Sequence, residues 1–318
     1  MRHIRAFPVR APVAASHARI HDEFSGVEKV SLLKKRAMMV AFARLRRGAA
    51  LLLICTGGAL AADDVSRWDG DDRSAARLIA GSSPDRAALL WRAGIEIRLK
   101  RGWHTYWRYP GDAGVPPEFD FQRSKNVKSV EVLWPTPRRL EEAGGVSIGY
   151  EGNVIFPLRI VPQDPGKPVA LAVKVDYAIC EKLCVPAQAR VELTLTGGSA
   201  SQDGRLKTAE ARVPQKRAPG EQGPLVIASA HREAGPTRPR VVVDIAAPAE
   251  TPLDLFAEGP TAQWALPVPE PIGGAPAGHK RFAFELDGLP PGASDRGAPI
   301  TLTAATPQHA IEVVIRLD

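Results

Sequence analysis

Short segments in which hydrophobic and polar residues alternate make up most of the chain from residue 75 onward. The alternation is regular over residues 171–177, where Lys174 and Asp176 interrupt apolar positions, and this period of two is typical of half-buried β-strands. Up to residue 196 the pattern predicts strands at 76–79, 87–99, 127–133, 153–161, 168–179 and 187–195. No long amphipathic helical pattern interrupts them, so the sequence favours an all-β fold built as an antiparallel β-sandwich.

A second series of short apolar segments follows a change in composition. Residues 197–223 are rich in Gly, Ser, Gln, Lys and Arg, which predicts a linker, with a short helix at 203–213. Further strands are predicted at 225–230, 240–245, 253–256, 281–286, 300–304 and 311–317. Their regular spacing and the Pro and Gly between them favour a second, smaller β-sandwich-like domain over residues 224–318.

The basic residues gather at the start of the chain. Residues 1–61 hold eleven Lys and Arg against three acidic residues, so they supply all of the formal charge of +7 and leave residues 62–318 at −1. A nearly neutral remainder without a basic patch argues against a nucleic-acid partner.

A secretory signal peptide is predicted within this basic region. Arg44, Arg46 and Arg47 precede the apolar run 48–60, and small residues lead to a cleavage site near Ala61. This run is too short to cross a bilayer comfortably. No later apolar run reaches the roughly 18 residues of a membrane span, so the mature chain is expected not to span a membrane.

Two details of the leader affect the rest of the interpretation. Residues 1–37 do not resemble a signal region, which indicates that they are an extension lying upstream of the true start of the protein. Cys55 follows Ile54, whereas a lipid-attachment site has a small residue at that position, so Cys55 is expected to leave with the signal peptide.

The mature chain then retains two cysteines, Cys180 and Cys184. One is predicted to end a strand and the other to begin the next, so a tight turn would bring their Cα atoms within the ~4.4–6.8 Å that a disulfide requires. Closing so short a loop stabilises a fold little, and a bridge on a turn is open to an attacking thiolate. This favours a redox-active pair, with Lys182 able to stabilise a thiolate and Glu181 opposing it.

Two other interpretations of the pair stay open on these residues. One is a passive structural disulfide. The other is a Cu(I) or zinc site made by the two sulfurs and His104, although no second pair of ligands has metal-site spacing.

Two further segments contain candidate residues. Residues 102–117 hold four aromatic side chains together with His104 and Arg108 before a Gly/Pro-rich turn, and are interpreted as core aromatics with a structured loop. Residues 144–152 are glycine-rich and predict a hairpin loop, in which Tyr150, beside Gly149, is the residue most able to shield a sulfur.

In this order, the segments GWHTYWRYPGDAGVPPEF, VEVLWPTPRR…GYEGNVIFPL and DYAICEKLCVPAQARVEL resemble the amino-terminal periplasmic domain of the DsbD/ScsB thiol:disulfide interchange proteins. The resemblance covers about residues 75–196 and implies an immunoglobulin-like sandwich within the domain 62–196. It implies that Cys180 and Cys184 are the catalytic pair, with Cys184 as the attacking thiol. Less closely, the loop near residues 144–150 corresponds to the cap over the pair.

The resemblance also implies a function and partners. It implies thiol:disulfide interchange of the protein-disulfide reductase type in the periplasm, without a cofactor. Electrons would pass from a membrane DsbD/ScsB/CcdA-like reductant to periplasmic thioredoxin-like or disulfide-containing proteins. The family's membrane domain and its C-x-x-C thioredoxin-like domain are absent from this sequence, and its familiar cysteine pair has a wider spacing. The alternative is a non-catalytic binding module, either a copper-handling accessory or a scaffold with a structural disulfide.

Overall fold

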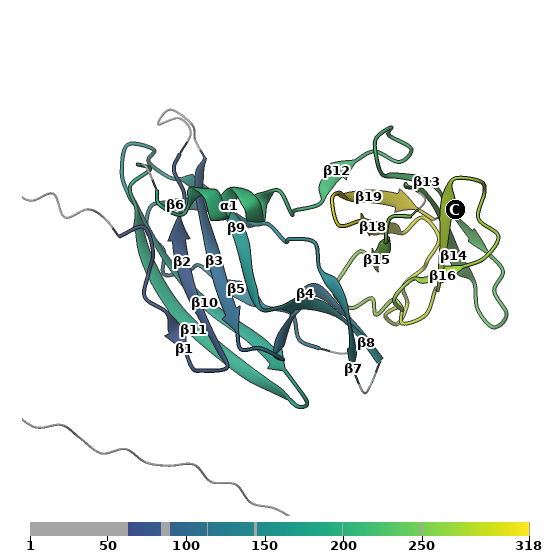
Figure 1. The fold of residues 1–318 in the computed structure, drawn as a ribbon, viewed down its shortest axis with the longest axis horizontal. Coiled ribbons are helices and arrows are strands. Elements are labelled where there is room, and N and C mark those ends of the chain that lie inside the picture. Colours follow the sequence, from purple (N-terminus) through teal and green to yellow (C-terminus); the bar gives the residue numbers. More distant parts are fainter. Residues whose placement is uncertain are drawn as a thin grey trace, which may run out of the picture. The chain divides into compact units, whose positions relative to one another are not determined.

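A computed structural model describes residues 63–83, 90–112, 114–142, 145–198, 200–248 and 250–317 (Figure 1). The predicted leader, signal peptide and cleavage site near Ala61 lie outside these residues. Within the described part of the chain, no helix is long and apolar enough to cross a membrane.

Two antiparallel sheets form the first domain, which confirms the predicted β-sandwich. In spatial order, the first sheet consists of β1 (Asp69–Gly70), β2 (Ser74–Ala80), β3 (Trp91–Leu99), β9 (Asn153–Pro162) and β6 (Val127–Val132). The second consists of β11 (Cys184–Leu195), β10 (Val169–Cys180), β4 (His104–Gly111), β8 (Gly145–Glu151) and β7 (Arg138–Glu142), and β5 (Glu118–Asp120) also pairs with β10.

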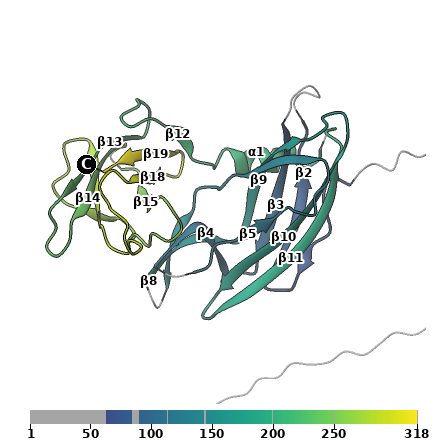
Figure 2. The ribbon, with the colours of Figure 1, turned by 180° about the vertical axis from the view of Figure 1, so that it is seen from behind.

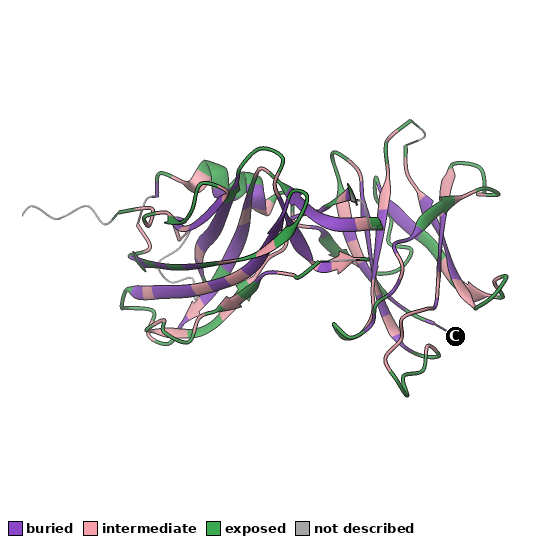
Figure 3. Ribbon diagram, turned by 90° about the horizontal axis from the view of Figure 1, so that it is seen from below, coloured by how far each residue is buried: buried purple, intermediate pink, exposed green. Residues whose placement is uncertain are grey.

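The core of this domain lies between the two sheets. Ile95 and Phe156 are fully buried there, and most strand residues are buried or half-buried while most loops are exposed (Figure 3). Along β10 the odd-numbered residues enter this core, as the alternation at 171–177 predicts. The even-numbered residues of β10 and β11 therefore lie on the outer face of the second sheet.

The segment predicted as a linker contains structure that belongs to both domains. Helix α1 (Asp203–Glu210) packs on the first domain, where its Leu206 is fully buried against Gly94. Its Arg205 pairs with Glu96, whose side chain is only 1% exposed and also accepts a hydrogen bond from Arg77 at 2.8 Å. The polar composition of residues 197–223 therefore reflects a surface helix and the segments next to it, and not only a linker.

The second β domain also contains two sheets. One has the order β12 (Gln215–Arg217), β19 (Ala310–Arg316), β18 (Pro299–Ala305) and β15 (Asp254–Glu258), with β12 parallel to β19. The other has the order β13 (Val226–Glu233), β14 (Arg240–Ala246), β17 (His279–Glu285) and β16 (Glu270–Ile272). Strand β12 comes from the predicted linker.

Strand β4 carries an arginine that pairs with carboxylates of the second β domain. The Arg108 guanidinium donates to Glu258 Oε1 at 2.6 Å and to Glu312 Oε2 at 2.5 Å. Burial alone would lower the pKa of Arg108, but the two carboxylates raise it above its ordinary value, so the guanidinium stays charged.

Candidate functional site

The two cysteines of the described chain form a disulfide across the β10–β11 hairpin. Cys180 ends β10, Cys184 begins β11, and the two residues are directly paired. Their Cα atoms lie 4.2 Å apart, close to the spacing of about 4.5 Å in antiparallel pairs that exchange no backbone hydrogen bonds. The predicted strand–turn–strand placement of the pair is confirmed.

The two sulfur-bearing residues differ in exposure. Cys180 is 4% exposed and packs with Tyr106 and Ala178 in a small cluster on the outer face of the second sheet. Cys184 is exposed. Cys184 is therefore the more accessible residue of the pair, and Cys180 is the one that the fold covers.

Tyr106 lies beneath the exposed sulfur. Its side chain is fully buried, and its hydroxyl lies 3.0 Å from Cys184 Sγ. The chain after β4 crosses this ring at Gly114, where an added Cβ would overlap with ring carbons Cδ1 and Cε1. Gly114 also has φ +119°, a backbone conformation that favours glycine. The close approach and the backbone together explain the glycine and fix the position of the tyrosine.

His104 belongs to the same face of the sheet. It is paired with Cys180 on one side and with Glu151 on the other, so the three side chains form a row across the strands β10, β4 and β8. His104 is 7% exposed, and its ring meets Tyr106 edge to face with centroids 5.4 Å apart. The structure thus brings His104, considered from the sequence as a metal ligand, beside the buried cysteine.

The charged residues of the turn have a different environment. Glu181 and Lys182 lie in the turn between the two cysteines, and both are exposed. Charges in such a position act through solvent, which weakens their effect on a sulfur.

Tyr150, expected to shield the pair, is placed elsewhere. Residues 145–151 form strand β8 instead of a hairpin loop, and Tyr150 is paired with Thr105, so it points to the inner face. Its hydroxyl donates to the Pro135 carbonyl at 2.8 Å, its ring packs edge to face on Phe156, and burial raises its pKa well above the ordinary value. The tyrosine that contacts a sulfur of the pair is Tyr106.

Gly149 lies next to Tyr106 on the cysteine-bearing face. The two residues are paired between β8 and β4, and a Cβ on Gly149 would overlap with the Thr105 carbonyl oxygen. Gly149 therefore allows the close approach of β8 to the strand that carries Tyr106 and His104.

The metal-site alternative gains no support from the geometry. Among the described residues, no group of three or more His, Cys, Asp and Glu side chains is placed to hold a metal ion.

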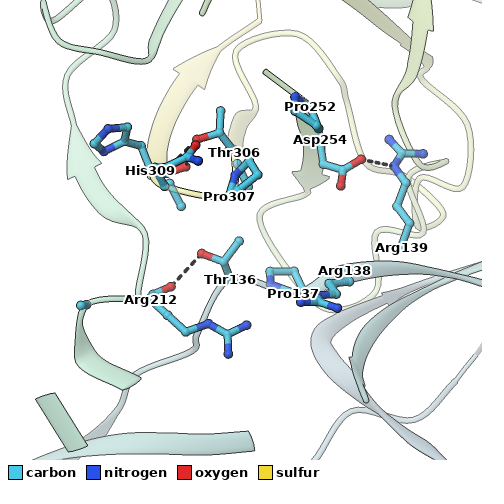
Figure 4. Close-up of a pocket in the computed structure, with 14 residues that line it drawn as sticks. Thr136, Pro137, Arg138, Arg139, Arg212, Pro252, Asp254, Thr306, Pro307 and His309 are labelled. Atoms are coloured by element: carbon cyan, nitrogen blue, oxygen red, sulfur yellow. Dashed lines mark hydrogen bonds and ion pairs between the residues drawn. The ribbon is translucent and has the colours of Figure 1, made fainter. Parts of the chain in front are cut away.

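The described residues also form a cavity of about 490 Å³ (Figure 4). Its lining includes Thr136, whose hydroxyl donates to the Arg212 carbonyl at 2.7 Å, and Arg139, whose Nε donates to Asp254 Oδ1 at 3.0 Å. Neither cysteine nor Tyr106 lines it. The disulfide on the outer face of the second sheet is therefore separate from this cavity.

Comparison with protein families gives a match over the segment that carries the site. Residues 87–196 match the family described as "Thiol:disulfide interchange protein DsbD, N-terminal". This segment is therefore similar to the DsbD N-terminal domain. The match includes both cysteines, Tyr106 and His104, and it confirms the resemblance seen in the sequence.

A solved structure extends the likeness in fold beyond the DsbD N-terminal domain. The crystal structure of the N-terminal periplasmic domain of ScsB from Proteus mirabilis is similar with a TM-score of 0.63 at 17% identity. The alignment covers 80% of this chain and 98% of that one, so it must include the second β domain as well. A comparison with curated proteins gives no match.

Proposed function

We propose that the chain catalyses thiol–disulfide exchange through Cys180 and Cys184 in the periplasm. In this proposal it relays electrons from a membrane DsbD/ScsB/CcdA-like reductant to thioredoxin-like or other disulfide-containing proteins. The observation that carries the proposal is a disulfide on a hairpin turn of a segment similar to the DsbD N-terminal domain, with one cysteine exposed and the other buried. Export of the chain, and the donor and acceptor, are parts of the proposal.

The exchange begins when a donor thiolate attacks Cys184 Sγ. The Cys180–Cys184 bond breaks, a mixed disulfide forms at Cys184, and Cys180 leaves as a thiolate that takes up a proton. A second donor thiol then displaces Cys184, which leaves the donor oxidised and the pair reduced. In the second half-reaction the Cys184 thiolate attacks an acceptor disulfide, and Cys180 resolves the mixed disulfide, so two electrons have moved to the acceptor.

Tyr106 is the residue placed to assist the reactive thiolate. Its hydroxyl, 3.0 Å from Cys184 Sγ, can donate a hydrogen bond to the sulfur when that sulfur is negatively charged. Because the ring is fully buried, the donor is already in position and loses little freedom on binding. A hydrogen bond to a charged group contributes about 1.5–3 kcal/mol, enough to favour the Cys184 thiolate.

His104 is the titratable side chain paired with the leaving sulfur. We assign it the role of supplying the proton that the buried Cys180 thiolate takes up, because an uncompensated thiolate is costly at a position only 4% exposed. The role makes His104 a proton donor to Cys180 and leaves Tyr106 as the hydrogen-bond donor to Cys184.

The decisive experiment compares two single-cysteine variants in a periplasmic extract. Cys180→Ser should accumulate mixed disulfides through Cys184, whereas the matched variant Cys184→Ser should trap far fewer, since its remaining sulfur is buried. The reduction potential of the wild-type pair should lie above the roughly −300 mV typical of structural bridges. A lower potential together with no trapped species would show a structural disulfide instead.

A further inference from the structure

Strand β11 lies at the border of the second sheet, next to the reactive disulfide (Figure 1, Figure 2). Its backbone direction follows from Arg190, whose N–H donates to Asp69 Oδ2 at 2.6 Å and therefore points away from β10. Backbone direction alternates along a strand. Cys184, Pro186 and Gln188 thus also direct their backbone groups away from β10, toward the open border.

Two independent observations support this assignment. Pro186 has no N–H, and it is paired with Ala178 at a position where none is needed for the β10–β11 ladder. The Cα atoms of Cys180 and Cys184 lie 4.2 Å apart, as expected for a pair without mutual backbone bonds. In the described part of the chain, neither Cys184 nor Gln188 has a backbone hydrogen bond to a residue beyond this border.

A cleft of about 440 Å³ adjoins the same border, on the side facing the first sheet. Near the disulfide its walls are Ile179, Pro186 and Ala187, and farther along they become polar, with Ser74 and Arg190 among the lining residues. Ala187 points inward because it alternates with Pro186 and Gln188. A strand added to β11 would therefore place every second side chain in this cleft.

We propose that the β11 border from Cys184 to Gln188 binds an extended segment of the partner polypeptide as an additional antiparallel strand. This docking rests on the proposed exchange function. The partner's cysteine lies opposite Cys184, and its own N–H and C=O pair with the backbone of Cys184. The small apolar walls near the disulfide favour a small or medium apolar residue beside the partner's cysteine.

The spacing of the added strand suits the covalent step. Residues that exchange backbone hydrogen bonds across antiparallel strands have Cα atoms about 5.5 Å apart, inside the ~4.4–6.8 Å range of disulfides. Both sulfurs lie on the outer face. The partner thiolate attacks Cys184 Sγ, the bond to Cys180 breaks, and Cys180 leaves as a thiolate and takes up a proton. One S–S bond replaces another, so the step is balanced.

Backbone-methylated peptides test this docking directly. The probes are reduced ten-residue peptides with one central cysteine, one N-methylated at the cysteine and at the residue two positions before it. The matched control is N-methylated at the residues directly before and after the cysteine, whose amides would face away from β11. The first peptide should open the disulfide about tenfold more slowly than the unmodified one, the effect of losing two backbone hydrogen bonds, and the control should react at the unmodified rate.

The outcomes separate the docking from the exchange function. Equal rates for both methylated peptides would overturn the docking, provided that the peptides react equally with glutathione disulfide. Failure of dithiothreitol and of every peptide to reduce the pair would instead overturn the exchange function.

A variant gives a second, independent measurement. Gln188→Pro removes an outward N–H at a border position where proline is tolerated, and should slow the unmodified peptide severalfold without changing reduction by dithiothreitol. Glu192→Pro serves as the control. The N–H of Glu192 also points away from β10, but Glu192 lies outside the proposed docking segment, so no effect is expected. In the mixed disulfide of Cys180→Ser with the peptide, the amides of Cys184 and Gln188 should exchange hydrogen slowly, and unprotected amides would overturn the docking.

Discussion

The Tyr106 hydroxyl and Cys184 Sγ lie 3.0 Å apart, although strand β10 separates the strands that carry them. Tyr106 also packs against the buried Cys180 in the same outer-face cluster. The tyrosine therefore contacts both residues of the pair, Cys180 within this cluster and Cys184 with its hydroxyl. Cys184 Sγ thus has a hydrogen-bonding neighbour in addition to its covalent bond to Cys180.

Replacing this tyrosine should destabilise the thiolate form of Cys184 relative to the thiol. Tyr106→Phe removes a hydrogen bond of about 1.5 kcal/mol or more to the charged sulfur. The pKa of Cys184 in the reduced protein should rise, and alkylation at neutral pH should slow about tenfold. The measurement is the pH dependence of alkylation in a Cys180→Ser background. Tyr109→Phe, which loses a hydroxyl bond to the Leu266 carbonyl instead, is the control, and an unchanged profile in Tyr106→Phe would remove the tyrosine from the mechanism.

The glycine over the tyrosine ring offers a separate test of how the site is covered. Gly114→Ala adds a methyl group that overlaps with the Tyr106 ring at a φ of +119°. We expect a loss of about 1–3 kcal/mol in the free energy of unfolding, measured by urea denaturation, and faster alkylation of reduced Cys180. Gly152→Ala is the matched control, because Gly152 also has positive φ (+70°) but has nothing within 4 Å of an added Cβ. Equal effects of both variants would show that only backbone strain matters.

Arg108 should be essential for stability because it faces two half-buried carboxylates. The side chains of Glu258 and Glu312 are 14% and 15% exposed, so Arg108→Met leaves two negative charges without compensation and should destabilise the protein by about 3–5 kcal/mol. Denaturant unfolding measures this loss. The triple variant Arg108→Met/Glu258→Gln/Glu312→Gln should recover most of it, and no recovery would mean that lost packing of the Arg108 stem, not charge, is responsible.

Glu96 should make the docking of α1 dependent on pH. Burial alone would raise its pKa, but hydrogen bonds from Arg205 and Arg77 lower it overall from 4.5. A depressed folded-state pKa contributes stability that is present above about 4.5 and is lost as the pH falls through the lower folded value.

Urea denaturation at about pH 6 and about pH 3.5 measures this dependence. Glu96→Gln should be less stable than wild type at the higher pH and should lose less stability on acidification. Asp71→Asn is a useful comparison, because hydrogen bonds from the Arg73 side chain and the Ser74 backbone lower the pKa of Asp71 to about 2 at an exposed position away from α1. A parallel loss in wild type and Glu96→Gln would exclude Glu96 as the titrating group.

Strands with one face in the core and one in solvent could be read from the sequence. In β10 and β11 the alternation follows burial closely, and this alone located the hairpin and its two cysteines. Strands β4 and β8 were not predicted. In β4 the outer-face residues Tyr106 and His104 are buried as well as the inner ones, so hydrophobic and polar positions do not alternate. Strand β8 contains two glycines within seven residues, and this composition is more typical of a loop.

This explains why a tyrosine was expected at the disulfide and a different tyrosine is found there. Which face a side chain occupies changes with each residue along a strand, so it depends on pairing. Thr105 is paired with Tyr150, and His104 with Cys180, which places Tyr150 in the core and Tyr106 at the sulfur.

The sequence by itself determined the strand-rich fold, the hairpin and the cysteine pair at its turn, because these depend on local alternation and on close spacing along the chain. Tertiary structure decided which sulfur is exposed, which tyrosine touches it and which strand border lies open beside it. These properties depend on sheet register and on the crossing of the chain at Gly114 over Tyr106, which join residues that are distant in sequence.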